Sequence, residues 1–84
     1  MTREEIAEIN PEALLCDGFD EAIIGMAERI TLGPVAAYSV SKILNIMMER
    51  DGMTYEEALE YYDYNILGAW MGEHTPIFIT TNND

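Results

Sequence analysis

Apolar residues recur at helical spacing between Ser39 and Asp51, which predicts a helix with one face on a core. Ser39 or Ser41 can cap its start, and Gly52 can end it in the left-handed conformation. The predicted core stripe consists of Val40, Ile43, Leu44 and Met47, widened by Ile46 and Met48.

The next predicted helix begins with a capping box, in which Thr54 caps the backbone and Glu57 reaches back to it. The residues expected on its core face are Tyr55, Ala58, Leu59, Tyr62, Ile66, Ala69 and Trp70. The residues expected away from the core are Glu56, Glu57, Glu60 and Asp63, with Tyr61 and Tyr64 alongside. The pattern therefore predicts one core face and one strongly acidic face.

A further capping box opens the chain, where Thr2 and Glu5 predict a helix over residues 3–9. Its inward-facing residues are expected to be Ile6 and Ile9. Asn10-Pro11 ends this helix and predicts a second short one, which carries Ala13, Leu14 and Leu15 until Gly18 stops it.

Three other stretches favour strands. The apolar residues of 21–30 fit both the helical and the strand period. Gly25 beside two isoleucines disfavours a helix interior, so we expect a strand. A turn over residues 31–34 would join it to residues 35–38 as a hairpin. Residues 77–80 predict one more strand, with Phe78 on the face opposite its isoleucines.

These elements predict an α+β fold, in which a small antiparallel sheet of about three short strands packs against the two capped helices. The N-terminal helical segment would close one side, and an all-α fold is the alternative. At 84 residues the chain is expected to form a single compact domain over residues 1–84, with frayed ends at 1–10 and 81–84.

Composition adds a formal net charge of −12, from sixteen acidic and four basic residues. The basic residues are Arg3, Arg29, Lys42 and Arg50. Because they are scattered, direct binding to DNA or RNA is disfavoured, and the same charge disfavours an anionic membrane surface. The natural partner of such a chain is basic.

The start of the chain lacks the basic and apolar zones of a secretion signal, and no apolar run approaches the length of a membrane span. We therefore expect a cytoplasmic protein. Cys16 is the single cysteine, so an internal disulfide is excluded, and we interpret it as a small, partly buried hydrophobe.

The segment that starts at Asp17 resembles a calcium-binding loop only superficially. Phe19 occupies its third position, and Ala22 stands at the sixth position, where glycine is needed. We interpret the segment as a solvated turn, in which Asp17 or Asp20 satisfies backbone donors and Phe19 anchors the core.

Other candidate chemistry is sparse. His74 follows Glu73 and could be imagined as a general base, or as a partner of Cys16, but no nucleophile, base and orienter are juxtaposed, and an exposed loop histidine is the preferred interpretation. Glu56 and Glu60 lie one helical turn apart but lack a second ligand pair for a metal. We therefore assign no catalytic residues, no metal site and no cofactor.

Three segments carry a family resemblance: ALLCDGFDEAIIG (13–25), MERDGMTYEEA (48–58) and NILGAWMGEHTPIF (65–78). Together they resemble a widespread group of small proteins encoded by bacteriophages and by bacterial genomes that carry prophages. The resemblance covers residues 10–80. It implies a phage-type origin and, for this protein, the cytoplasm of the host, but that group has no established activity to carry over to any residue.

The leading hypothesis is a non-enzymatic accessory protein whose acidic helix docks on a basic, nucleic-acid-handling host protein and modulates or inhibits it, for instance in host defence. The residues of this hypothetical binding face are Glu56, Glu57, Glu60, Asp63, Tyr61 and Tyr64. Exposed together, Met48, Met53, Tyr61 and Tyr64 would give the face an apolar and aromatic centre.

Two alternatives stay open. The acidic face could serve solubility alone. The chain could also form a homo-oligomer that holds a small molecule in a cavity between subunits. The residues expected to line that cavity are Tyr61, Tyr64, Trp70 and His74.

Overall fold

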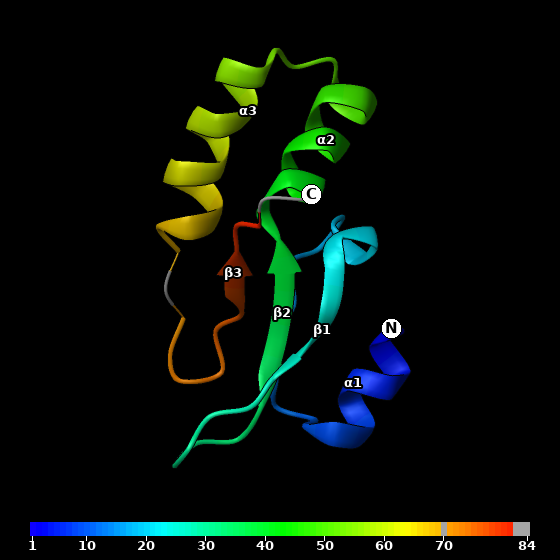
Figure 1. Ribbon diagram of the computed structural model, residues 1–84, viewed down its shortest axis with the longest axis vertical. Helices are drawn as coiled ribbons and strands as arrows, with labels where there is room; N and C mark the ends of the chain where they lie inside the picture. Colours follow the sequence, from blue (N-terminus) through cyan, green and yellow to red (C-terminus); the bar gives the residue numbers. More distant parts are fainter. Residues whose placement is uncertain (70, 82–84) are drawn as a thin grey trace.

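The computed structural model describes residues 1–69 and 71–81, and its architecture is the α+β fold expected from the sequence (Figure 1). The all-α alternative is therefore wrong. The elements in chain order are α1 (Arg3–Ile9), η1 (Asp20–Ala22), β1 (Ile23–Ala27), β2 (Val35–Ser39), α2 (Val40–Asp51), α3 (Tyr55–Tyr61), η2 (Tyr62–Leu67) and β3 (Ile77–Ile79). Here η1 is a turn of 3₁₀-helix, and η2 continues α3 as a π-helix.

The sheet has the order β1-β2-β3, and β2 is the central strand. β1 pairs antiparallel with β2, which confirms the predicted hairpin. β3 pairs parallel with β2, so the expectation of a wholly antiparallel sheet is wrong for this strand. The reason is the connection between these strands. In the sequence, α2, α3 and η2 separate β2 from β3, and the chain returns to the end of the sheet where β2 begins before it enters β3 (Figure 1).

β1 is shorter than the predicted strand over residues 21–30. A register shift between Ile23 and Gly25 interrupts its pairing with β2. Beyond Ala27 the chain leaves the sheet, and Ile30 is fully exposed. Arg29 holds the following turn by donating hydrogen bonds to the carbonyl of Gly33, which explains why the strand period is lost there.

α2 follows β2 without a loop, and the Ser39 hydroxyl caps it by accepting a hydrogen bond from the amide of Lys42. Gly52 ends the helix at φ 69°, as predicted. The predicted capping box of α3 is also present, with both of its hydrogen bonds. The junction between the two helices is thus specified by local sequence.

The predicted core face of the last helix is only partly correct. Ala58 and Tyr62 are buried and Ile66 is half-buried, whereas Tyr55, Leu59 and Ala69 are exposed. The helix widens to a π-helix at Tyr62, which rotates later side chains away from a 3.6-residue stripe. Trp70, the last residue of that stripe, lies outside the described residues.

At the N-terminus the predicted helix α1 and its capping box are present. Ile6 is buried, but Ile9 is about half exposed, because α1 presents only one turn to the core. The second short helix, predicted to end at Gly18, does not form. Two amides of this segment instead bond to distant partners: Leu14 to the His74 carbonyl and Cys16 to the Tyr38 hydroxyl.

The core gathers around Tyr38, which is fully buried in the middle of the sheet. Its ring centroid lies 5.8 Å from that of Phe78 on β3, and Phe78 in turn contacts Tyr62 edge-to-face at 5.7 Å. This aromatic row connects the sheet to the start of η2. It fixes which side of α3 faces inward and therefore which side faces out.

Candidate protein-binding surface

The four predicted carboxylates of the last helix lie on an exposed surface. Glu56, Glu57 and Glu60 belong to α3, and Asp63 belongs to η2; all four side chains are exposed. From Asp51 to the end of the chain the sequence contains no lysine or arginine. The acidic face predicted from the sequence is thus present, without a cation on its own part of the chain.

Glu57 is the member of this group with a structural task, because its Oε1 accepts a hydrogen bond of 2.8 Å from the Thr54 amide. The ion pairs among the residues that the structure describes involve other carboxylates. Glu56, Glu60 and Asp63 are therefore outside those pairs.

Two of the arginines, Arg3 and Arg50, pair with aspartates outside α3 and η2. Arg3 donates to Asp20 at 2.8 and 2.9 Å and to Asp17 at 3.1 Å, which joins α1 to η1. The hydrogen bond from Arg3 holds the pKa of the Asp20 carboxyl below its ordinary value. The structure thus pairs both Asp17 and Asp20 with Arg3, which differs from the prediction that one of them bonds to backbone donors. Phe19 is buried, as predicted.

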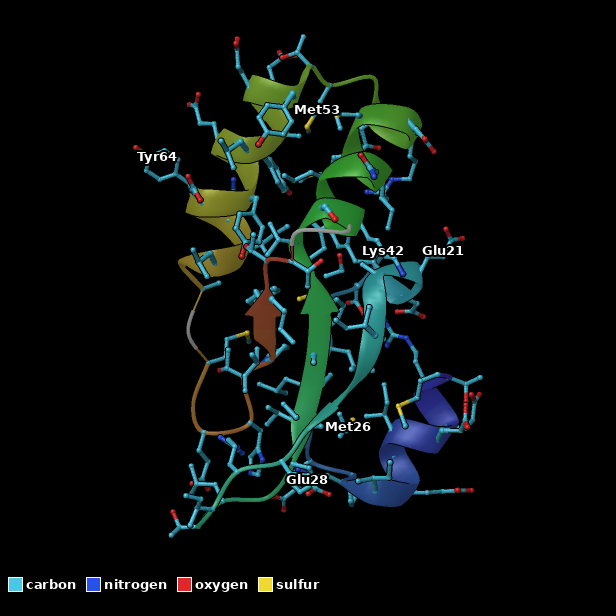
Figure 2. All side chains as sticks on the ribbon, in the orientation of Figure 1. Glu21, Met26, Glu28, Lys42, Met53 and Tyr64 are labelled. Carbon is cyan, nitrogen blue, oxygen red and sulfur yellow. The ribbon has the colours of Figure 1, made fainter. Side chains whose placement is uncertain are left out.

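Arg50, near the end of α2, likewise bonds to an aspartate and connects two segments of the chain. Its guanidinium donates to Asp51 at 3.0 Å and to the carbonyl of Gly18 at 2.7 Å, and it lies over the Phe19 ring at 5.1 Å. The hydrogen bond from Arg50 lowers the pKa of the Asp51 carboxyl. Lys42, on the same helix, lines a shallow hollow together with Glu21, and Figure 2 shows these two residues side by side.

A hollow of about 370 Å³ lies beside α3, and its lining residues are Met53, Glu57, Glu60, Tyr61, Tyr64 and Asn65. Tyr61 is 43% exposed and Tyr64 is 78% exposed, while Met53 is half-buried. In Figure 2, Met53 lies where α2 and α3 meet, and Tyr64 projects outward from the helix. We call this set the tyrosine hollow.

The tyrosine hollow brings together most of the predicted apolar centre with two of the predicted carboxylates. Met48 does not belong to it, because its half-buried side chain lines a different groove. The sequence analysis missed Asn65, although its position four residues after Tyr61 places it on the same side of a helix.

That second groove, of about 520 Å³, runs between α2 and α3, and all of its lining residues are uncharged: Val40, Ser41, Leu44, Asn45, Met48, Tyr55, Leu59 and Thr80. Tyr55 and Leu59 were assigned to the core from their spacing. An apolar stripe does not reveal how wide the facing surface is, so these residues could not be recognised as groove residues from the sequence.

Of the residues predicted to line a small-molecule cavity, the three that the structure describes do not share one hollow. Tyr61 and Tyr64 share the tyrosine hollow, but the Nε2 of His74 lies 2.9 Å from Glu12 and 3.8 Å from Glu73. The expectation that His74 is an exposed loop residue is correct for the loop but not for the exposure: His74 lies in a turn, its side chain is 27% exposed, and its buried Nδ1 has no hydrogen-bond partner among the described residues. Trp70 lies outside the described residues.

Cys16 is partly buried, and burial raises the pKa of its thiol, which disfavours the nucleophilic thiolate. Its amide donates to the hydroxyl of Tyr38, whose own pKa is raised to about 12, chiefly by burial. In residues 1–69 and 71–81, no cluster of three or more His, Cys, Asp or Glu side chains is suited to hold a metal ion.

Comparison with protein-family models, with curated proteins and with solved structures finds no match to this chain. Among the described helices, none has the length and apolar character needed to cross a membrane.

Proposed function

We propose that this chain is a non-enzymatic binding protein whose acidic face docks on the basic surface of another protein and modulates or inhibits that partner. The observation that carries the proposal is the exposed position of Glu56, Glu60 and Asp63, which lie outside the ion pairs of the described residues, while Arg3 and Arg50 pair with aspartates of other elements. Complementary charge of this kind steers association and selects the partner.

The tyrosine hollow supports the proposal from a second direction. Protein-binding sites combine an apolar or aromatic centre with a polar rim, and tyrosine is enriched at such centres. Here Tyr61 and Tyr64 are exposed beside Met53, and Glu57 and Glu60 belong to the same lining. A surface that served solubility alone would need the carboxylates but not the exposed aromatic rings.

The partner class follows from the charge. A row of carboxylates along a helix resembles the phosphates of a nucleic-acid strand in charge, so a host protein that handles nucleic acid offers the matching basic groove. The phage-type resemblance points in the same direction, toward a protein of the host cytoplasm such as a defence nuclease.

The test compares the wild type with the triple variant Glu56→Gln, Glu60→Gln, Asp63→Asn, in which Glu57 is left in place because it caps α3. The matched control is Glu4→Gln, Glu8→Gln, Glu28→Gln, which removes the same charge from exposed positions elsewhere. Each immobilised protein is exposed to bacterial lysate at low and moderate salt, and retained proteins are then purified and titrated calorimetrically.

We expect one or more basic proteins to bind the wild type and the control, to bind the triple variant at least about tenfold more weakly, and to lose affinity as salt rises. Equal binding to all three proteins would show that the acidic face is not the docking surface. Retention of no protein by any of them would favour the interpretation that the charge serves solubility.

A further inference from the structure

We propose that the tyrosine hollow receives an arginine side chain of the basic partner. This inference rests on the proposed function and deepens it, because it names the group that the surface recognises. The hollow, of about 370 Å³, lies at the edge of the acidic face and shares Glu57 and Glu60 with it.

The aromatic residues provide the first contribution. Tyr61 and Tyr64 are three residues apart and line the same hollow, with 43% and 78% of their surfaces exposed. A cation that lies over a tyrosine ring is attracted by the negative face of the π-system, and arginine uses this contact more often than lysine.

The carboxylates provide the second contribution. Glu57 uses Oε1 to accept from the Thr54 amide, which leaves its other oxygen available to a ligand. Glu60, three residues later, lines the same hollow. A planar guanidinium presents several N–H donors in a fixed arrangement and can serve two acceptors at once, which a lysine ammonium does less selectively.

Met53 provides the third contribution, because its half-buried thioether gives an apolar wall for the methylene groups of a long cationic side chain. The tyrosine hollow thus combines a π-face, carboxylate oxygens and an apolar wall. All three match parts of one side chain, which argues for a single arginine rather than for diffuse attraction.

The chain itself contains a comparable arrangement. Arg50 lies over the ring of Phe19, and its guanidinium donates to the carboxylate of Asp51 and to the Gly18 carbonyl. Arg50 is close enough to Tyr61 for a weak electrostatic interaction, yet its bonds hold it on the η1 side. It is not among the residues that line the tyrosine hollow.

The experiment uses two peptides of equal length and charge that alternate glycine with a cationic residue, arginine in one and lysine in the other. Their dissociation constants are measured at moderate salt with the wild type, with Tyr61→Phe/Tyr64→Phe, which keeps both rings, and with Tyr61→Leu/Tyr64→Leu, which keeps only apolar bulk. Circular dichroism verifies that each variant retains the fold.

We expect the wild type and the phenylalanine variant to prefer the arginine peptide by about two- to fivefold, and the leucine variant to lose that preference while its affinity for the lysine peptide changes little. Equal affinity of the wild type for both peptides, or a preference that survives in the leucine variant, would overturn the arginine site and leave the acidic docking face standing. If neither peptide binds, both proposals fail.

Discussion

The two sides of this molecule treat their carboxylates differently. On the side formed by α1, η1 and the end of α2, Arg3 and Arg50 engage the neighbouring aspartates. On the side formed by α3 and η2, the carboxylates are exposed and the sequence supplies no basic residue. Both sides are acidic, but of the two only the first contains ion pairs between arginine and aspartate among the described residues.

The difference shows what the arginines do in a chain of net charge −12. Arg3 joins α1 to η1 across 17 positions, and Arg50 reaches from α2 to Gly18 across 32 positions. Arg3 thereby fixes α1, in which Ile6 is the buried residue, and Arg50 fixes the exposed turn at Gly18. α3 and η2 contact the core through Ala58 and Tyr62, and their exposed carboxylates lie outside the ion pairs of the described residues, so these charges are available to a partner.

The largest predicted change in the free energy of unfolding comes from a comparison of the buried and the exposed face of the last helix. Tyr62→Ala removes a buried ring that contacts Phe78, and it should lower the free energy of unfolding by about 3 to 5 kcal/mol, as for other large aromatic truncations. Tyr64→Ala, at a site 78% exposed, should change it by less than about 0.5 kcal/mol. Urea unfolding measures both, and a comparable loss in the two variants would mean that Tyr64 has a structural role.

Local signals in the sequence predicted the elements well and their contacts less well. The capping boxes at Thr2 and Thr54 and the left-handed Gly52 depend on neighbours within a few residues, so they could be recognised directly. The direction of β3 and the extended segment before Gly18 depend on partners far away in the chain, and no local pattern specifies those partners.

In the candidate surface, too, features that depend on neighbouring residues could be predicted, whereas features that depend on distant segments could not. The acidic face follows from helical spacing, because charged residues on a helix rarely face a core. The exposure of Tyr55 and Leu59 could not be predicted, because it depends on how much of α3 the neighbouring helix α2 covers. The proximity of His74 to Glu12 is likewise a consequence of the tertiary fold.

A change in stability of intermediate size is expected at the start of α3. Thr54→Ala removes the hydroxyl that accepts from the Glu57 amide and leaves only the bond from the backbone amide of residue 54 to Glu57, so the free energy of unfolding should fall by about 1 kcal/mol. Thr31→Ala, at an exposed position in the turn between β1 and β2, is the control and should have little effect. An unchanged urea midpoint for Thr54→Ala would show that packing alone positions α3.

The smallest change in stability concerns the ion pairs of Arg3 and depends on pH. The Arg3 guanidinium holds the pKa of the Asp20 carboxyl below its ordinary value of 3.8. Since the folded-state pKa is the lower one, the stabilisation is present above 3.8 and is lost as the pH falls through the folded-state value. Arg3→Gln should therefore be less stable than the wild type at pH 7, and this difference should shrink at about pH 2, which lies well below the ordinary pKa of an aspartate.

Lys42→Gln removes the same charge from α2 and serves as the control for net charge, because its effect should not follow the titration of Asp20. Thermal unfolding at the two pH values measures the difference for each variant. If the difference for Arg3→Gln persists at low pH, Arg3 stabilises the fold through packing of its side chain. If the stability difference for Arg3→Gln shrinks at low pH, the ion pairs of Arg3 hold α1 and η1 together. The carboxylates of α3 and η2 then differ from Asp17 and Asp20 because they belong to none of the ion pairs of the described residues.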